Sequence, residues 1–365
     1  MTDNELIKII DQFDNIYSHC SGIGDFQRKQ KLSILETSTY NSLIPIEDDI
    51  FSEFHLSPNQ LNFEIQTIPN ATWDNLLEYT SSHVNKSGSG KSLKLAIKET
   101  TTNKFVGLIR LGSPFINCKP RNEILGEAFT NSANLAASFN NTVMMGFVIV
   151  PLQPFGFNYL GGKLLAGICC SHEIREMINK KYGTNICLFE TTSLYGTSKT
   201  VSQYDGMEPY IKFKGITESK FIPVPSGDDY DLLKSIVDSI DNTIIVRQGA
   251  SKKLKSMGRI ISFVRKNLKD KAQLDRFNSI VDKAFQLTER KRYYISNYGF
   301  KNSVEYILGK DEQLIPNTNY DRFYLENIIA WWKNKAEKRY NNLIEQGRLR
   351  KEIEIQTTEG LDMLR

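Results

Sequence analysis

The sequence predicts an α/β protein with a mixed sheet and flanking helices, followed by a mostly helical C-terminal region. Two observations predict this fold. Between residues 61 and 217, stretches of period-2 hydrophobicity alternate with stretches of helical period. Beyond Gly227, the apolar residues recur almost entirely at helical spacing. We expect three regions: a helical and irregular extension over 1–60, an α/β domain over 61–226 and a helical basic region over 227–365.

The expected elements follow from the same patterns. A first helix is expected over 2–17, and little pattern follows up to about residue 60. Strands are expected where apolar and β-branched residues alternate or run together, at 61–68, 92–99, 104–112, 144–150, 185–192 and 210–216. Helices are expected over 72–83, from Gly161 onward, over 229–240 with Asp228 and Asp229 as caps, and over about 320–345.

Composition narrows the class of protein. The chain has 365 residues, 40% of them hydrophobic and 24% charged, which is enough for a sizeable core. It contains no run of about 18 apolar residues and opens with no basic, apolar leader, so we expect a cytoplasmic protein without a membrane partner. The five cysteines and four histidines show no ligand spacing, so we expect reduced core thiols and no metal site.

Charge is distributed unevenly along the chain. Residues 247–300 hold 14 Lys/Arg against 4 Asp/Glu, whereas residues 1–246 hold 21 against 27. Aromatic residues are interspersed with these cations, a mixture that suits a polyanion whose bases stack on rings. The alternative is a solvated helical face whose rings lie in the core. The candidate nucleic-acid contacts are Lys252, Lys253, Lys255, Arg259, Arg265 and Lys266, with Lys199, and with Arg110 as a phosphate contact or a surface ion pair.

A second candidate site lies between Met144 and Thr192, where an apolar strand, a loop, a glycine-opened helix and another strand follow one another. The start of such a helix offers unpaired N–H groups and a positive dipole end to a phosphate. Gln153, Gly161, Gly162 and Lys163 are therefore candidate cofactor contacts. The alternative is close packing of the helix on the sheet, for which glycines are also suited.

Polar side chains gather after the strand that ends near Thr192. Candidate catalytic residues there are Glu190, Ser193, Tyr195, Tyr204 and Asp205. Carboxylates can act as general bases when burial raises their pKa, and tyrosines can donate a proton or stack on an extruded base. The alternative is a hydrogen-bonded polar loop with Gly196 and Gly206 as its turn residues.

The order strand, helix, three strands, glycine-opened helix, strand resembles the GNAT acyltransferase superfamily. In that superfamily, backbone N–H groups at the corresponding helix start hold the pyrophosphate of acyl-CoA. The resemblance implies acyl-CoA or another activated acyl or aminoacyl donor near the stretch PLQPFGFNYLGGKLLA. The basic residues usual before the glycines are replaced here by Phe155, Phe157 and Tyr159.

A nearer resemblance covers about residues 104–217, in the blocks KFVGLIRLGS, NNTVMMGFVIVP, YLGGKLLA and YGTNICLFETTSLYGTSKTVSQYDGM. These blocks resemble the DruA family of the Druantia anti-phage system, at Asn140, Asn141, Gly161, Gly162, Tyr182, Gly183, Glu190, Thr191 and Gly196. The fold is similar to that of the phage Mom protein, which modifies adenine in DNA. The resemblance implies a group transferase acting on a DNA base, with a phage genome as its origin. The alternatives are a non-catalytic nucleic-acid-binding component of a defence or counter-defence system, and a small-molecule acyltransferase. Donor, acceptor base and oligomeric state stay open.

Overall fold

The computed structural model describes residues 2–37, 46–82, 90–115, 117–130, 135, 138–193, 201–218, 221–225, 227–249, 251–287, 290–361 and 363. The chain forms two compact units. The helical unit comprises Met1–Thr39, Ser219–Arg290 and Leu361–Met363. The sheet unit comprises Tyr40–Glu218, Lys291–Gly360 and Leu364–Arg365. These boundaries differ from the three expected regions, because the N-terminal helices join residues 219–290 and about half of the expected C-terminal region joins the sheet.

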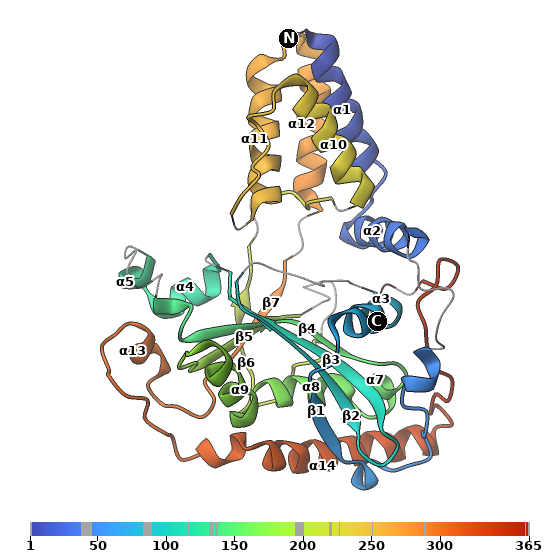
Figure 1. The fold of residues 1–365 in the computed structure, drawn as a ribbon, viewed down its shortest axis with the longest axis vertical. Coiled ribbons are helices and arrows are strands. Elements are labelled where there is room, and N and C mark those ends of the chain that lie inside the picture. The colour runs from blue at the N-terminus through green and yellow to red at the C-terminus, as the bar shows by residue number, and fades with distance from the viewer. Residues whose placement is uncertain are drawn as a thin grey trace. The chain divides into compact units, whose positions relative to one another are not determined.

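Seven strands form one mixed sheet in the order β1-β2-β3-β4-β5-β7-β6. Neighbours are antiparallel except β4 and β5, which are parallel. The strands are β1 (Phe63–Gln66), β2 (Ser92–Glu99), β3 (Lys104–Gly112), β4 (Val143–Pro151), β5 (Leu188–Thr192), β6 (Lys212–Ile216) and β7 (Arg292–Ser296). The predicted mixed α/β fold with flanking helices and a helical C-terminal region is confirmed (Figure 1). Six strands lie where period-2 patterns predict them.

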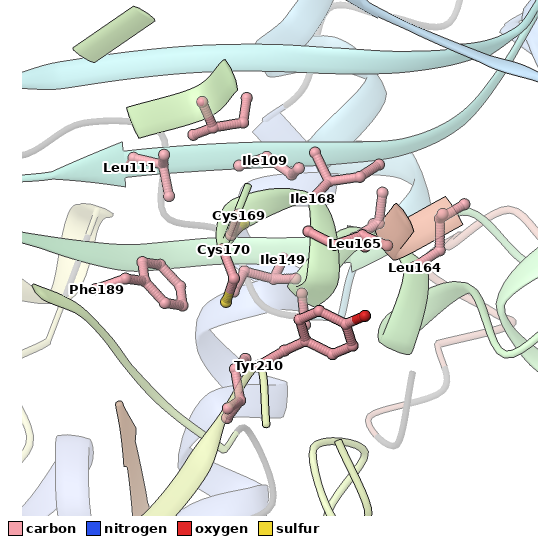
Figure 2. Packing of buried hydrophobic residues seen from close by; sticks show 14 of the residues in the cluster. Ile109, Leu111, Ile149, Leu164, Leu165, Ile168, Cys169, Cys170, Phe189 and Tyr210 are labelled. Atoms are coloured by element: carbon pink, nitrogen blue, oxygen red, sulfur yellow. The ribbon is translucent and has the colours of Figure 1, made fainter. Parts of the chain in front are cut away.

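Two helices are layered on one face of the sheet. The apolar helix α8 (Gly161–Cys169) packs on β3 and β4, and α14 (Leu325–Glu345) packs on α8 (Figure 1). Figure 2 shows Leu164, Leu165 and Ile168 of α8 in the same core as Ile109 and Ile149 of the sheet. Trp332 of α14 closes this layer and donates to the carbonyl of Tyr159 at 2.9 Å.

The predicted helix from Gly161 is in fact two helices. It ends at Cys169, and Ser171 then caps α9 (His172–Tyr182) by accepting a hydrogen bond from the N–H of Ile174. The other helical segments of the sheet unit are η2 (Ile46–Asp49), η3 (Pro58–Gln60), α3 (Asn70–Thr80), α4 (Lys119–Leu125), α5 (Glu127–Thr130), α7 (Phe155–Asn158), α13 (Ser303–Ile307) and η4 (Tyr320–Phe323).

The seventh strand was not predicted. β7 lies between β5 and β6, although its residues fall within the predicted helical basic region. Tyr293 and Tyr294 point to opposite faces of this strand and both are buried. The strand is central and only five residues long, so its short alternation could not be distinguished from the surrounding helical pattern.

The helical unit has its own core. It contains α1 (Asp3–Tyr17), α2 (Ile23–Thr37), α10 (Gly227–Ile240), α11 (Lys252–Asn267) and α12 (Lys271–Gln286), and α2 was not predicted. Phe13 of α1 meets Phe277 of α12 edge to face, with ring centroids 5.2 Å apart. Asp270 caps α12 by accepting from the N–H groups of Ala272 and Gln273. The first and second segments of the unit therefore fold together across about 180 intervening residues of sequence.

No helix in the described parts of the chain is long and apolar enough to cross a membrane. Within those same parts, no three His, Cys, Asp or Glu side chains come together as a metal site would require. All five cysteines are free, and Cys169, Cys170 and Cys187 are buried.

Candidate functional site

Glu190 lies in the middle of β5 and forms a buried polar triad with Arg121 and Tyr293. The guanidinium of Arg121, on α4, donates to the Glu190 carboxylate at 2.9 Å. The hydroxyl of Tyr293, on β7, donates to the other carboxylate oxygen at 2.6 Å. Glu190 points to the α4 face because it alternates with Phe189 and Thr191 along the strand.

Burial dominates the electrostatics of this triad. It raises the pKa of Glu190, while the charge of Arg121 and the hydrogen bonds from Tyr293 and Arg121 oppose the rise. The side chains of Glu190 and Arg121 are each 1% exposed, and the Arg121 guanidinium lies 4.4 Å from the centre of the Phe139 ring. A substrate proton cannot reach this carboxylate in the present conformation. The triad therefore joins α4, β5 and β7 as a buried polar link.

A second polar cluster surrounds Asp205, on the opposite face of β5 and β7. Its carboxylate accepts from the hydroxyl of Tyr294 at 2.9 Å and from the N–H of Ser202 at 2.8 Å, and lies 3.8 Å from a guanidinium nitrogen of Arg292. The side chains of Asp205 and Arg292 are both half-buried. Of the predicted catalytic residues, Asp205 thus remains within reach of a ligand.

Tyr204 and Ser193 contribute to packing and to strand pairing. Tyr204 is buried, its ring meets that of Tyr294 edge to face at 5.2 Å, and burial raises its pKa. Ser193 continues the pairing of β5 with β7, since its N–H donates to the carbonyl of Arg292 and its hydroxyl accepts from the Arg292 N–H. Tyr195 lies outside the described residues. The predicted catalytic set is therefore divided between the two faces of the sheet, with Glu190 on one and Tyr204 and Asp205 on the other.

The glycine-opened start of α8 is closed by neighbouring atoms. A Cβ on Gly161 would lie 2.7 Å from Pro151 and 2.9 Å from Phe155, and one on Gly162 would lie 2.6 Å from the amide oxygen of Gln203. Both glycines therefore serve close packing, the alternative considered above.

The two polar candidates beside these glycines, Lys163 and Gln153, already form hydrogen bonds within the protein. Lys163 donates to the carbonyl oxygens of Gln203 and Asp205, and Gln153 accepts from the N–H of Phe157. Burial lowers the pKa of Lys163. A pyrophosphate needs an open helix end, whereas Pro151, Phe155 and Gln203 fill the space beside Gly161 and Gly162. The residues present do not fit acyl-CoA.

Arg110 does not lie on the surface. It is 1% exposed on β3, and its guanidinium lies 4.6 Å from the centre of the Phe147 ring. Burial lowers its pKa. Its predicted role as an exposed phosphate contact or surface ion pair is therefore wrong. Both faces of β3 are buried in the protein, so neither face of this strand is exposed to solvent at Arg110. Lys199 lies outside the described residues.

The basic residues of α11 are all exposed. They are Lys252, Lys253, Lys255, Arg259, Arg265 and Lys266. In the part of the chain that the structure describes, none of the six forms an ion pair. Other basic residues of the segment do: Arg247 pairs with Asp238 at 3.0 Å, and Arg276 pairs with Asp11 and Asp14 at 2.8 and 2.7 Å. The predicted basic segment thus contains ion-paired cations, such as Arg247 and Arg276, and exposed cations without an ion pair, which include the six of α11.

The aromatic residues near this segment mostly belong to the core, as the alternative interpretation held. Buried rings are those of Phe277, Tyr293, Tyr294, Tyr298 and Phe300, and the last four lie in the sheet unit. Phe285 is exposed and Phe263 is half-buried. Stacking by bases on the helical unit can therefore involve Phe263 or Phe285, and not the buried rings.

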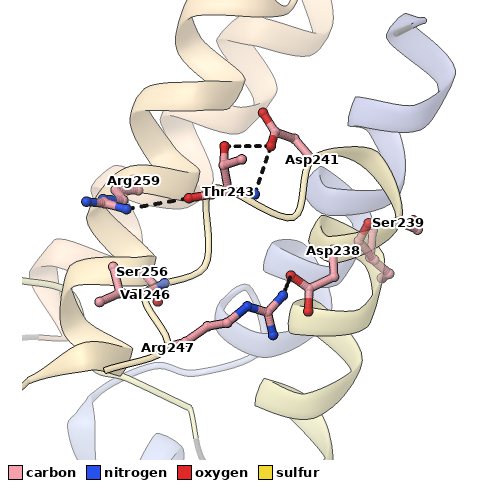
Figure 3. Close-up of polar contacts among 9 residues, drawn as sticks. Asp238, Ser239, Asp241, Thr243, Val246, Arg247, Ser256 and Arg259 are labelled. Carbon is pink, nitrogen blue, oxygen red and sulfur yellow. Dashed lines mark hydrogen bonds and ion pairs between the residues drawn. The ribbon is translucent and has the colours of Figure 1, made fainter. Parts of the chain in front are cut away.

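One open hollow of about 860 Å³ lies along α11. It is lined by Asp241, Thr243, Ile244, Lys255, Gly258, Arg259, Ser262, Phe263, Lys266 and Asn267, and we call it the α11 groove. Figure 3 shows the segment between α10 and α11 lying against the helix, with Arg259 donating to the carbonyl of Thr243 at 3.5 Å. Three of the six cations of α11 therefore line this wide, open hollow. The sequence signalled the charge of α11 but not the hollow.

Two comparisons with known proteins, one with family models and one with curated proteins, agree on one family. The family model described as "Druantia protein DruA" matches residues 20–206. The curated Druantia protein DruA of Escherichia coli (strain UMEA 4076-1) is 26% identical over 179 residues, which is 44% of this chain and 43% of that protein. The match therefore spans less than half of the relative's length. No solved structure matches. The family match includes Arg121, Glu190 and Asp205 and ends before α11.

Proposed function

The chain belongs to the DruA family, and from that premise we propose that it is a nucleic-acid-binding component of an anti-phage system. The exposed cations of α11 hold the nucleic acid, and DNA is the first candidate. Of the functions that the sequence suggested, this one claims no catalytic step. It is favoured because it needs only groups that are accessible, whereas Glu190, Ser193 and Tyr204 are buried.

A single observation carries the proposal. α11 has six Lys/Arg and no Asp/Glu over 16 residues, and three of the lysines lie in its first turn. Cations at a helix N-terminus oppose the macrodipole at a cost of about 0.3–1 kcal/mol each. Neither helix stability nor ion pairing accounts for this arrangement. Binding to a polyanion does, because the cations would then neutralise its charges.

Charge-matched variants test this function. In the full chain, Lys255→Gln/Arg259→Gln removes two unpaired cations, and Arg247→Gln/Arg276→Gln removes two paired ones as a control. We expect the first variant to weaken binding of a fluorescent DNA oligonucleotide by about tenfold or more at low salt. The control should bind nearly as the wild type, because its cations are already neutralised by carboxylates. Equal affinities for all three proteins would refute the proposal.

Group transfer onto a nucleic-acid base is the second candidate. It is supported by the half-buried pair Asp205 and Arg292, which the hydroxyl of buried Tyr294 joins. Beside them, Phe213 is 49% exposed and packs edge to face on Tyr294 at 5.6 Å. An extruded base can stack on such a ring while a carboxylate accepts from its amino group. Nucleoside mass spectrometry of DNA and RNA from cells expressing the wild type or Asp205→Asn decides it. A new mass that depends on Asp205 supports transfer, and its absence leaves binding alone.

A further inference from the structure

We propose that the α11 groove receives the sugar–phosphate backbone of a single nucleic-acid strand, and that Gly258 is where this backbone approaches the helix most closely. The inference rests on the proposed function. It adds the form of the nucleic acid and the place where it binds.

Gly258 has no packing reason to be glycine. It lies in the interior of α11 and is exposed, and a Cβ at this position would meet no atom within 4 Å among the described residues. Alanine would fit there and would favour the helix. A glycine inside a helix costs helix stability, and one that lines a groove lets another backbone come close.

The cations of the groove lie in one row along α11, and Gly258 lines the same groove at about 60–100° from them around the helix axis. Lys255, Arg259 and Lys266 fall within about 40° of one another around the helix axis, at 100° per residue. Lys255 and Arg259 are separated by about 6 Å along the axis, at 1.5 Å per residue. Such a row of charges follows a chain of phosphates rather than a single anion.

The other lining groups suit the bases of the strand. Phe263 is half-buried and offers part of its ring for stacking. Asp241 is the one carboxylate among the lining residues, and its hydrogen bonds from the hydroxyl and N–H of Thr243 lower its pKa and keep it charged. Three cations against one carboxylate leave the groove positive.

The segment between α10 and α11 favours a single strand over a duplex. A recognition helix must project into the major groove with its charged face free. Here the chain lies against α11, where the hydroxyl of Ser256 accepts from the N–H of Val246 at 2.9 Å and Arg259 contacts Thr243 (Figure 3). The protein's own chain therefore covers part of the charged face, which leaves less room for a duplex than for a flexible single strand.

The test compares Gly258→Ala and Gly258→Gln with Gly24→Ala in the full chain. Gly24 is the matched control, because it is an exposed glycine in α2 and a Cβ there would also meet nothing within 4 Å. Affinities are measured by fluorescence anisotropy for a single-stranded DNA, a single-stranded RNA of the same sequence and the DNA duplex. We expect the wild type to bind both single strands more tightly than the duplex. The difference in affinity between the DNA strand and the RNA strand shows whether deoxyribose or ribose is favoured.

We expect Gly258→Ala to raise the melting temperature and Gly258→Gln to weaken single-strand binding by roughly fivefold or more, since a displaced backbone loses part of its contact with the cations. Gly24→Ala should leave affinity unchanged. Tighter binding of the duplex, or wild-type affinity for Gly258→Gln, overturns this inference. If Lys255→Gln/Arg259→Gln still weakens binding in that case, the proposed function stands and only the groove assignment fails.

Discussion

Arg121 and Glu190 form a salt bridge at 2.9 Å in which each side chain is 1% exposed. The bridge joins α4 to the centre of the sheet, and the hydroxyl of Tyr293 completes the pairing of the carboxylate. Removing one partner of a buried pair leaves an uncompensated charge, whereas removing both does not.

We therefore expect Glu190→Gln to destabilise the sheet unit by about 3 kcal/mol or more. Urea unfolding followed by tryptophan fluorescence measures this unit alone, because Trp73, Trp331 and Trp332 all lie in it. The double variant Arg121→Met/Glu190→Leu should recover most of the loss. If Glu190→Gln is as stable as the wild type, the triad is not a structural link, and a catalytic role for Glu190 regains its support.

The sequence predicted the site only in part, for reasons visible in this triad. Glu190 follows an apolar strand, so its position was identifiable. Arg121 comes from a stretch without clear periodicity, and Tyr293 comes from a strand hidden in a basic segment. Contacts between residues 69 and 103 positions apart depend on tertiary pairing, which no local pattern records. Strands β2 and β3, by contrast, begin and end at the predicted residues because their patterns are long and bounded by turns.

The sheet unit should lose stability as pH falls through the range of histidine. His172 is 2% exposed, and its Nε2 donates to the carbonyl of Tyr320 at 3.0 Å, so the neutral ring is deprotonated at Nδ1. Among the described residues, buried Nδ1 has no hydrogen-bond partner. Burial lowers the pKa of His172 below its ordinary value of 6.5, so the unfolded chain binds more protons and stability rises with pH there.

The expected result is a fall in the tryptophan-monitored melting temperature from about pH 7 to pH 5, smaller in His172→Gln than in the wild type. His55→Gln is the control, because the His55 side chain is 74% exposed. An identical pH profile for wild type and His172→Gln would contradict this account of the buried ring.

Gly161 and Gly162 should differ in their tolerance of alanine. A Cβ on Gly161 meets Pro151, Phe155 and the Cα of Gly156, none of which is the end of a flexible chain. A Cβ on Gly162 meets only the side chain of Gln203, which can move. We expect Gly161→Ala to cost about 1–3 kcal/mol in the free energy of unfolding, and Gly162→Ala much less.

The same glycines give a test of the cofactor expectation. Acetyl-CoA should not raise the melting temperature of the sheet unit, because the start of α8 is closed by these packing contacts. A rise that depends on acetyl-CoA concentration, lost in Gly162→Ala, would show that the Gln203 segment opens and that the site binds the cofactor.

The salt dependence of single-strand binding tests the central claim most directly. Each contact between a cation and a phosphate of a single strand adds about 0.7 to the slope of log affinity against log salt. We predict that Lys255→Gln/Arg259→Gln/Lys266→Gln lowers the wild-type slope by about 2, at unchanged melting temperature. A slope equal to that of the wild type, or the absence of nucleic-acid binding by the wild type, would contradict the claim that α11 holds a nucleic acid.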